Sequence, residues 1–186
     1  MSPSNIGIYA SQISGHLVNP AYDSIATTTL STATASITFS SIPATYTHLQ
    51  IRGIARGGSG SAAIRIRCNG DTATNYAAHE LYGDGASASA YAESGVSSGF
   101  ADYFGPSSAG ANIFGVGVID ILDYANTNKK TTIRSLSGYD NNGSGGIALS
   151  STLWNDTSAV TSITLFYASS NLVQYSSFAL YGIKGA

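Results

Sequence analysis

The sequence contains little charge. Lys, Arg, Asp and Glu make up 10% of its 186 residues, against about 25% in an average soluble domain. The net charge is −2, and the few basic residues are scattered along the chain: Arg52, Arg56, Arg65, Arg67, Lys129, Lys130, Arg134 and Lys184. Because no basic patch is present, we expect no nucleic-acid binding driven by counterion release. Ser, Thr, Asn and Gly fill the polar positions instead, as is typical of chains that pack against copies of themselves or are exposed outside a cell.

Cysteine and long apolar runs are also scarce. Cys68 is the single cysteine, which excludes an internal disulfide. It ends an alternating run, so we expect it to pack in the core rather than to react. The N-terminus lacks the basic and apolar regions of a signal peptide, and no apolar run approaches the roughly 18 residues of a membrane span. We therefore expect a soluble protein without membrane insertion.

Helical periodicity is absent, and the pattern is β throughout. Leu49 and Ile51 alternate with polar residues in one run, and Ile64, Ile66 and Cys68 do so in the next, as strands with one buried face require. The dipeptide Asn-Gly follows the second run and favours a tight turn. Further strand-like runs begin at Ala35, Asn112, Lys130, Thr161 and Ser176.

Many short strands without intervening helices predict a sandwich or barrel. We predict an antiparallel β-sandwich of jelly-roll type over residues 24–186, with residues 86–95 as a loop or an edge strand. Residues 1–23 are predicted to form an extended N-terminal arm, because their apolar residues show no sustained period. This arm could anchor the domain to a neighbouring subunit or be a terminal strand of the domain itself. Its candidate anchor residues are Ile6, Ile8, Tyr9 and Ile13.

The segment NYAAHELYGDG (residues 75–85) combines a His, a Glu and an Asp. On a strand, His79 and Leu81 share one face while Glu80 points the other way, so the His and the Glu cannot cooperate. A zinc motif of the H-E-x-x-H type is excluded because its second His is missing. We expect His79 on the inner or subunit-facing side, donating a hydrogen bond to a backbone carbonyl or to a neighbouring chain.

Other enzyme-like motifs are incomplete. Asp120 and Asp123 are the best candidate carboxylate pair, but residues three apart on a strand face opposite ways. Ser97 lies in a G-x-S-x-G match that no His and no helix follow. The stretch from Asp140 resembles a calcium loop, yet Ser151 stands where a Glu is required, so we expect a glycine-rich hairpin loop. We predict no catalytic residue, no metal and no cofactor.

Aromatic residues are abundant, with twelve tyrosines and one tryptophan. Trp154 lies in LWNDTS, which we interpret as a turn, and Tyr82, Tyr91 and Tyr139 lie near strand ends. Exposed rings of this kind serve either a subunit interface or stacking on a sugar. We favour the interface.

Four segments together resemble structural proteins of tailed bacteriophages: YTHLQIRGIAR, IRIRCNGDTATNYAAHELYGDG, IDILDYANTNKKTTIRSLSG and SSFALYGIKG. The similarity is closest to jelly-roll proteins on the heads and fibres of phages of aquatic bacteria, and it covers Ser24 to Gly185. In that family, the element corresponding to residues 69–81 forms a strand, a turn and a strand rather than a catalytic centre.

The resemblance implies a virion component, usually a homotrimer. Together with the small size and the N-terminal arm, it leads us to expect a non-enzymatic capsid decoration, cement or head-fibre protein on the particle surface. Its partners would be copies of itself and the major capsid protein or another virion protein. The alternative is a tail-fibre module that recognises a host surface glycan through Trp154 and the tyrosines, and a weaker one is a depolymerase acting on that glycan.

Overall fold

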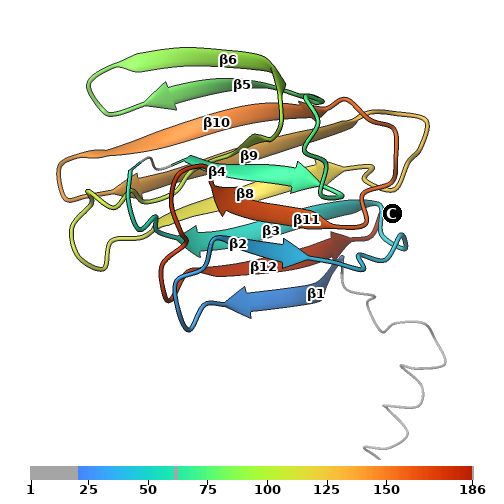
Figure 1. Ribbon diagram of the computed structural model, residues 1–186, viewed down its shortest axis with the longest axis horizontal. Coiled ribbons are helices and arrows are strands. Elements are labelled where there is room, and N and C mark those ends of the chain that lie inside the picture. Colours follow the sequence, from blue (N-terminus) through green and yellow to red (C-terminus); the bar gives the residue numbers. More distant parts are fainter. Residues whose placement is uncertain (1–20, 61–62, 186) are drawn as a thin grey trace, which may run out of the picture.

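The computed structural model describes residues 21–60 and 63–185. Within these residues the chain is all-β, as predicted: two antiparallel sheets pack face to face as a β-sandwich (Figure 1). The same residues include no helix long and apolar enough to cross a membrane. The strands are β1 (Tyr22–Thr29), β2 (Ser36–Phe39), β3 (His48–Ala55), β4 (Ala63–Cys68), β5 (Tyr76–Gly83), β6 (Ala88–Val96), β7 (Gly99–Tyr103), β8 (Gly115–Leu122), β9 (Thr131–Asp140), β10 (Gly145–Trp154), β11 (Ile163–Tyr167) and β12 (Ser177–Ile183).

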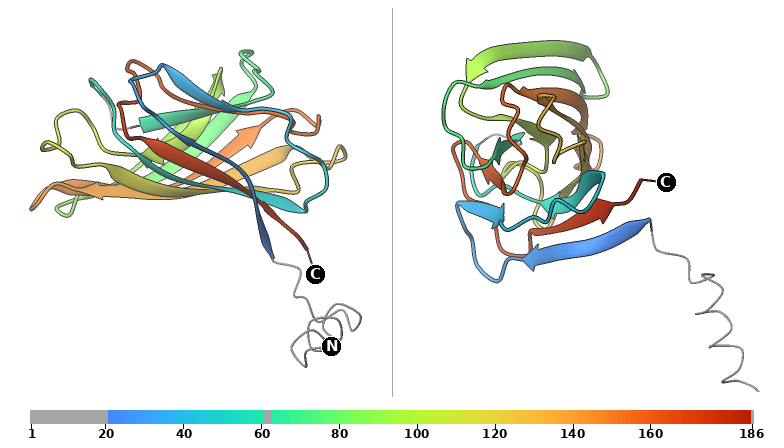
Figure 2. Two further views of the ribbon diagram at one scale, coloured as in Figure 1. Left: turned by 90° about the horizontal axis from the view of Figure 1, so that it is seen from below. Right: turned by 90° about the vertical axis from the view of Figure 1, so that its right-hand side faces the viewer.

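The two sheets differ in size. The larger has eight strands in the order β1-β12-β3-β8-β9-β10-β5-β6, and the smaller has four in the order β2-β11-β4-β7. Figure 2 shows the small sheet covering one side of the large one, with β5 and β6 at one end of the molecule. The β5–β6 and β9–β10 hairpins account for the difference in size. Without these hairpins, each sheet would have four strands, ordered β1-β12-β3-β8 and β2-β11-β4-β7.

The core lies between the sheets and follows the alternation in the sequence. In β3, Leu49 and Ile51 are 0% exposed, and in β4 so are Ile64, Ile66 and Cys68. These strands therefore bury one face each, as the period of two predicts.

Turn chemistry is also as predicted. Asn69 and Gly70 both have positive φ, 54° and 67°, in the turn after β4. The glycine-rich stretch after Asp140 forms the loop of the β9–β10 hairpin, with Asn142 and Gly143 at positive φ. The EF-hand loop that this stretch resembles connects two helices, whereas here the loop connects two paired strands.

Several elements differ from expectation. Residues 88–96 form β6, the edge strand at one side of the large sheet, which agrees with one of the two alternatives for that region. Strand β1 begins at Tyr22, inside the predicted arm. Strand β10 was not predicted, because its inward positions are small and partly polar. The candidate anchor residues Ile6, Ile8, Tyr9 and Ile13 lie outside the described residues.

Candidate interaction surface

The outward side of the large sheet carries apolar side chains where an antiparallel sheet facing water normally carries polar ones. We call these side chains the apolar face. They come from five adjacent strands, β3, β8, β9, β10 and β5, and each is at least 38% exposed: Ile54, Val116, Val118, Leu136, Ile147, Leu149 and Leu81.

The strand register places these side chains in two neighbouring rows. In one row, Ile54 pairs with Val116, Val116 with Gly138, and Gly138 with Ile147. The second row runs through Val118, Leu136, Leu149 and Leu81. Because side chains directly opposite each other across strands are in contact range, the two rows form one continuous patch rather than scattered residues.

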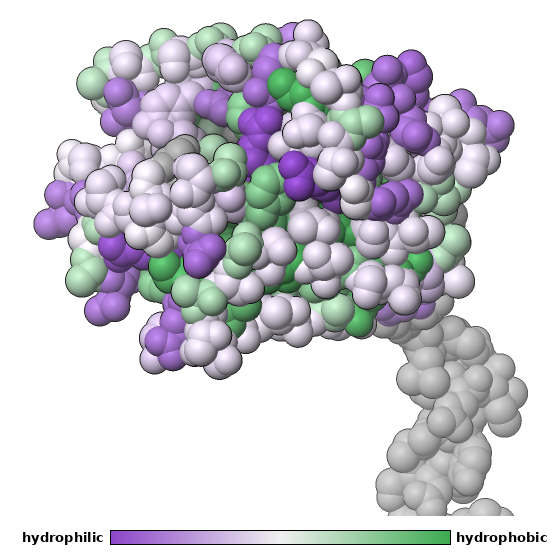
Figure 3. Space-filling view, in the orientation of Figure 1, coloured by the Kyte–Doolittle hydropathy of each residue, from purple (hydrophilic) through white to green (hydrophobic). Residues whose placement is uncertain are grey.

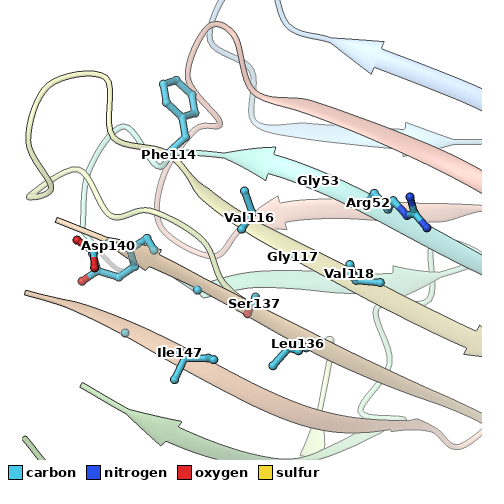
Figure 4. A pocket seen from close by; sticks show the side chains of 13 residues that line it. Arg52, Gly53, Phe114, Val116, Gly117, Val118, Leu136, Ser137, Asp140 and Ile147 are labelled. Carbon is cyan, nitrogen blue, oxygen red and sulfur yellow. The ribbon is translucent and has the colours of Figure 1, made fainter. Parts of the chain in front are cut away.

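A shallow hollow of about 700 Å³ lies in this patch. Gly138 lines the hollow and pairs with Val116 on one side and Ile147 on the other, so no side chain stands between these two residues. A Cβ on Gly138 would lie 2.7 Å from the carbonyl oxygen of Gly146, so the position cannot be filled without moving the backbone. Figure 4 shows the side chains that surround the hollow, among them Val116, Val118, Leu136 and Ile147.

A polar network borders the apolar face along the next row. Gln50 Nε2 donates a hydrogen bond of 2.8 Å to Asp120 Oδ1, and Arg134 donates one of 3.1 Å to Asp120 Oδ2. Arg52 Nε in turn donates to Gln50 Oε1 at 2.9 Å. An apolar centre with a hydrogen-bonded polar border is the usual anatomy of a protein–protein interface, and isolated apolar residues would not have this arrangement.

Asp120 and Asp123, the candidate carboxylates that were expected to face opposite ways, have different partners. Asp120 belongs to the polar network just described, whereas Asp123 lies in the turn after β8 and forms an ion pair with Lys129. The hydrogen bond from Lys129 is the main cause that lowers the pKa of Asp123. A carboxyl group with a lowered pKa is a poor general acid, so Asp123 is not suited to protonate a leaving group.

His79 lies on the outward side of β5, so the inner alternative of its prediction is wrong, and the subunit-facing alternative stays a prediction. In β5 the inward residues are Tyr76 and Ala78, which are each 1% exposed, while His79 and Leu81 are exposed on the outward side. The Tyr76 hydroxyl reaches the core and accepts a hydrogen bond from the Cys68 amide at 2.9 Å. That contact determines which face of β5 points into the core and places His79 on the outward face.

Within the described residues, no group of three or more His, Cys, Asp or Glu side chains could hold a metal.

The prediction that Trp154 presents an exposed ring is also wrong. Trp154 is the last residue of β10 and is 2% exposed. Its Nε1 donates a hydrogen bond of 2.8 Å to Asp71 Oδ2. The ring therefore packs in the core and has no free face for a sugar or a subunit.

The three tyrosines of interest are distributed over two places. Tyr82 and Tyr139 flank Tyr103, with ring centroids 4.6 Å and 6.0 Å away from it. All three point to the inner side of the large sheet and are half-buried, so they pack mainly against one another. Tyr91 on β6 is different, because it is 55% exposed and touches Phe100 edge-on.

Sequence reasoning missed the apolar face altogether, since it assigned the strand apolar residues to the core. The signal was present in β8, where VGVIDIL is apolar at successive positions and therefore apolar on both faces.

Comparison with known proteins adds no family: no protein-family model matches the chain, and a search of curated proteins finds no match.

Proposed function

We propose that the protein is a non-enzymatic structural component of a tailed-phage virion, a trimeric capsid decoration, cement or head-fibre protein. The observation that carries the proposal is the apolar face, which is bordered by hydrogen-bonded polar groups and suits burial against another copy of the chain. The major capsid protein or another virion protein would then be the second partner, reached through the N-terminal arm.

The strand order supports the jelly-roll part of this proposal. A jelly roll has two four-stranded sheets whose strands alternate between the sheets along the chain. Leaving out the β5–β6 and β9–β10 hairpins, each strand lies in the other sheet from the strand before it, except that β7 follows β4 within the small sheet. We interpret the domain as a jelly roll with two inserted hairpins, and three of the inserted strands carry part of the apolar face.

The oligomer is tested by measuring the mass in solution by light scattering. We expect the full chain to have about three times the mass of the 19.0 kDa subunit. The double variant Leu136→Thr/Ile147→Thr keeps β-propensity but removes apolar area from the centre of the face. Burying each of these side chains stabilises by roughly 1.5–3 kcal/mol, so the variant should dissociate at least about 100-fold more readily.

Leu122→Thr is the matched control. Leu122 is the last residue of β8 and is 50% exposed, but it lies beyond Asp120 and outside the apolar face. Its substitution should leave the mass unchanged. A monomeric wild type, or equal masses for the wild type and the double variant, would contradict the subunit interface.

Attachment to a capsid is tested separately. The full chain and a chain lacking residues 1–19 are sedimented with empty shells of the major capsid protein encoded alongside it. We expect both proteins to be trimeric and only the full chain to sediment with the shells. Failure of the full chain to bind would move the protein away from the capsid surface.

A further inference from the structure

The outward side of the small sheet carries two arginines stacked on aromatic rings. Arg65 in β4 lies between Phe166 of β11 and Phe100 of β7 in the strand register. The Cζ atom of Arg65 is 4.3 Å from the Phe100 ring centroid, and that of Arg67 is 4.4 Å from the Phe166 centroid. Figure 3 views this side of the molecule and shows strongly hydrophilic side chains gathered around the middle of its upper half, in the region of β4.

The charge of Arg65 is already compensated. Its Nη2 forms an ion pair of 2.5 Å with Glu93 Oε1 on β6, and the two side chains are 12% and 13% exposed. Arg65 also donates to the hydroxyl of Ser98 at 3.1 Å and to its carbonyl at 2.8 Å. This arginine therefore ties β6 to the small sheet, and its charge is paired with that of Glu93.

Arg67 has a different environment. Its Nε donates a hydrogen bond of 2.9 Å to the Ser97 carbonyl. No carboxylate of the described residues forms an ion pair with it, and its two terminal nitrogens have no hydrogen-bond partner among those residues. A guanidinium that is held by its Nε and by a ring, with both terminal nitrogens free, is preorganised for a planar anion such as a carboxylate.

Arg67 lies where two hollows meet. One hollow, of about 520 Å³, lies between β6 and the small sheet and is lined by Tyr91 and Phe100. The other, of about 460 Å³, adjoins β2 and the loop after β11 and is lined by hydroxyl groups of Ser36, Thr164 and Ser170. Arg67 and Phe166 line both, so the two hollows form one groove with an aromatic end, a hydroxyl-rich end and a cation between them.

We propose that this groove binds an acidic saccharide whose sugar carboxylate pairs with Arg67. The exposed ring of Tyr91 offers a platform for a pyranose ring. Ser36 offers a hydroxyl for a hydrogen bond to a sugar hydroxyl, whereas the hydroxyls of Thr164 and Ser170 are already bonded to Thr38 and to the Ser59 amide and offer only their remaining lone pairs. One uncompensated cation suits one carboxylate, whereas a polyanion such as a nucleic acid would require several in a row. The proposal does not depend on the trimer or on the capsid.

The direct test is calorimetric titration of the full chain with a hexuronic-acid tetrasaccharide and with the methyl ester of the same tetrasaccharide. We expect binding of the acid and at least about tenfold weaker binding of the ester, because the ester has no charge for Arg67 to pair with. Equal binding of both, or no binding of the acid at millimolar concentration, would overturn the proposal. Tighter binding of a single-stranded oligonucleotide than of the acid would do the same.

Variants locate the site. Arg67→Gln should weaken binding of the acid at least about tenfold and leave binding of the ester unchanged, while Tyr91→Ala should weaken both. Lys130→Gln removes an exposed charge from the turn before β9, outside the lining of both hollows, and should change neither. Should Arg67→Gln unfold at a lower temperature, Arg67→Lys supplies the second measurement, since it keeps the charge but not the planar fork. If Arg67→Lys binds the acid as tightly as the wild type, the two terminal nitrogens of Arg67 do not bind the carboxylate together, which contradicts the proposal. The mass in solution is measured for each variant, so that failure here is distinguishable from failure of the proposed trimer.

Discussion

Trp154 and Asp71 are joined by a hydrogen bond of 2.8 Å from the indole Nε1 to the carboxylate Oδ2. The contact connects the end of β10 in the large sheet to the turn that follows β4 in the small one. Asp71 also accepts hydrogen bonds from the Ala73 amide at 2.8 Å and from Asn75 Nδ2 at 3.0 Å. One carboxylate thus shapes the segment between β4 and β5 and holds the core tryptophan.

This contact predicts a loss of stability in acid. The hydrogen bond from Trp154 is the largest cause that lowers the pKa of Asp71 below its usual value of 3.8. A lowered folded-state pKa means that the contribution is fully present above pH 4 and is lost as the pH falls through the folded-state pKa. Asp71→Asn should therefore lower the free energy of unfolding by about 1 kcal/mol at pH 7, and less at pH 3.

Urea unfolding followed by fluorescence checks this prediction, because Trp154 is the single tryptophan. Asp140→Asn, which changes an exposed carboxylate at the end of β9, is the control and should have little effect at either pH. A difference between wild type and Asp71→Asn that stays constant between pH 7 and pH 3 would contradict the role of the charged form.

The sequence predicted the sandwich and most of its strands because β3, β4, β11 and β12 bury apolar residues at every second position. β10 escaped prediction for a physical reason: its inward residues include Ser150 and Thr152, while its outward residues Ile147 and Leu149 are apolar. The inward hydroxyls are satisfied within the core, where Ser135 and Ser150 are hydrogen-bonded at 2.6 Å. Such pairing depends on register between strands, which alternation within one strand does not reveal.

Two predictions, the inner side for His79 and the exposed ring of Trp154, failed for the same reason. The apolar Leu81 suggested that its side of β5 faced inward, and the turn formers after Trp154 suggested an exposed ring. Both placements depend on contacts that alternation within one strand does not show: Tyr76 of β5 contacts Cys68 of β4, and Trp154 contacts Asp71, 83 residues away. The groove around Arg67 likewise combines β4, β6 and β11, and no local motif marks it.

The Thr152 hydroxyl joins the two sheets, and its removal should destabilise the fold. Its Oγ1 accepts a hydrogen bond of 2.9 Å from the Phe100 amide and donates one of 3.1 Å to the Phe100 carbonyl. Thr152 is 0% exposed, so water cannot replace these bonds. Thr152→Val keeps the shape but leaves both groups of Phe100 without this partner, and we expect a loss of about 2 kcal/mol in the free energy of unfolding.

Thr152→Ser is the matched variant, because it keeps the hydroxyl and removes only a methyl group. It should cost about 1 kcal/mol, less than the valine variant. If urea unfolding gives the opposite order, the methyl packing over Gly99 matters more than the hydrogen bonds.

The Cys68 thiol should be inert in the folded protein. It is 0% exposed, and burial, with a smaller contribution from the charge of Asp71, raises its pKa to about 12. Since the thiolate is the reacting form, a thiol reagent at pH 8 should label the chain only as fast as it unfolds, and should label it fully in urea. Mass spectrometry counts the label, because the chain has one cysteine. Rapid labelling without urea would show that the thiol is accessible.

Gly182 should tolerate no side chain. It lies inward in β12, where a Cβ would fall 2.3 Å from Cγ of the Tyr46 ring. Gly182→Ala must therefore displace a ring that packs against the core, and we expect a loss of about 1–3 kcal/mol in the free energy of unfolding.

Gly58→Ala is the control, since the nearest atom to its Cβ would be 3.6 Å away, an ordinary contact. At that loop position the alanine narrows the unfolded ensemble, so the control should be as stable as the wild type or slightly more so. Equal stability of the two alanine variants in urea would mean that the Tyr46 ring is not held against β12.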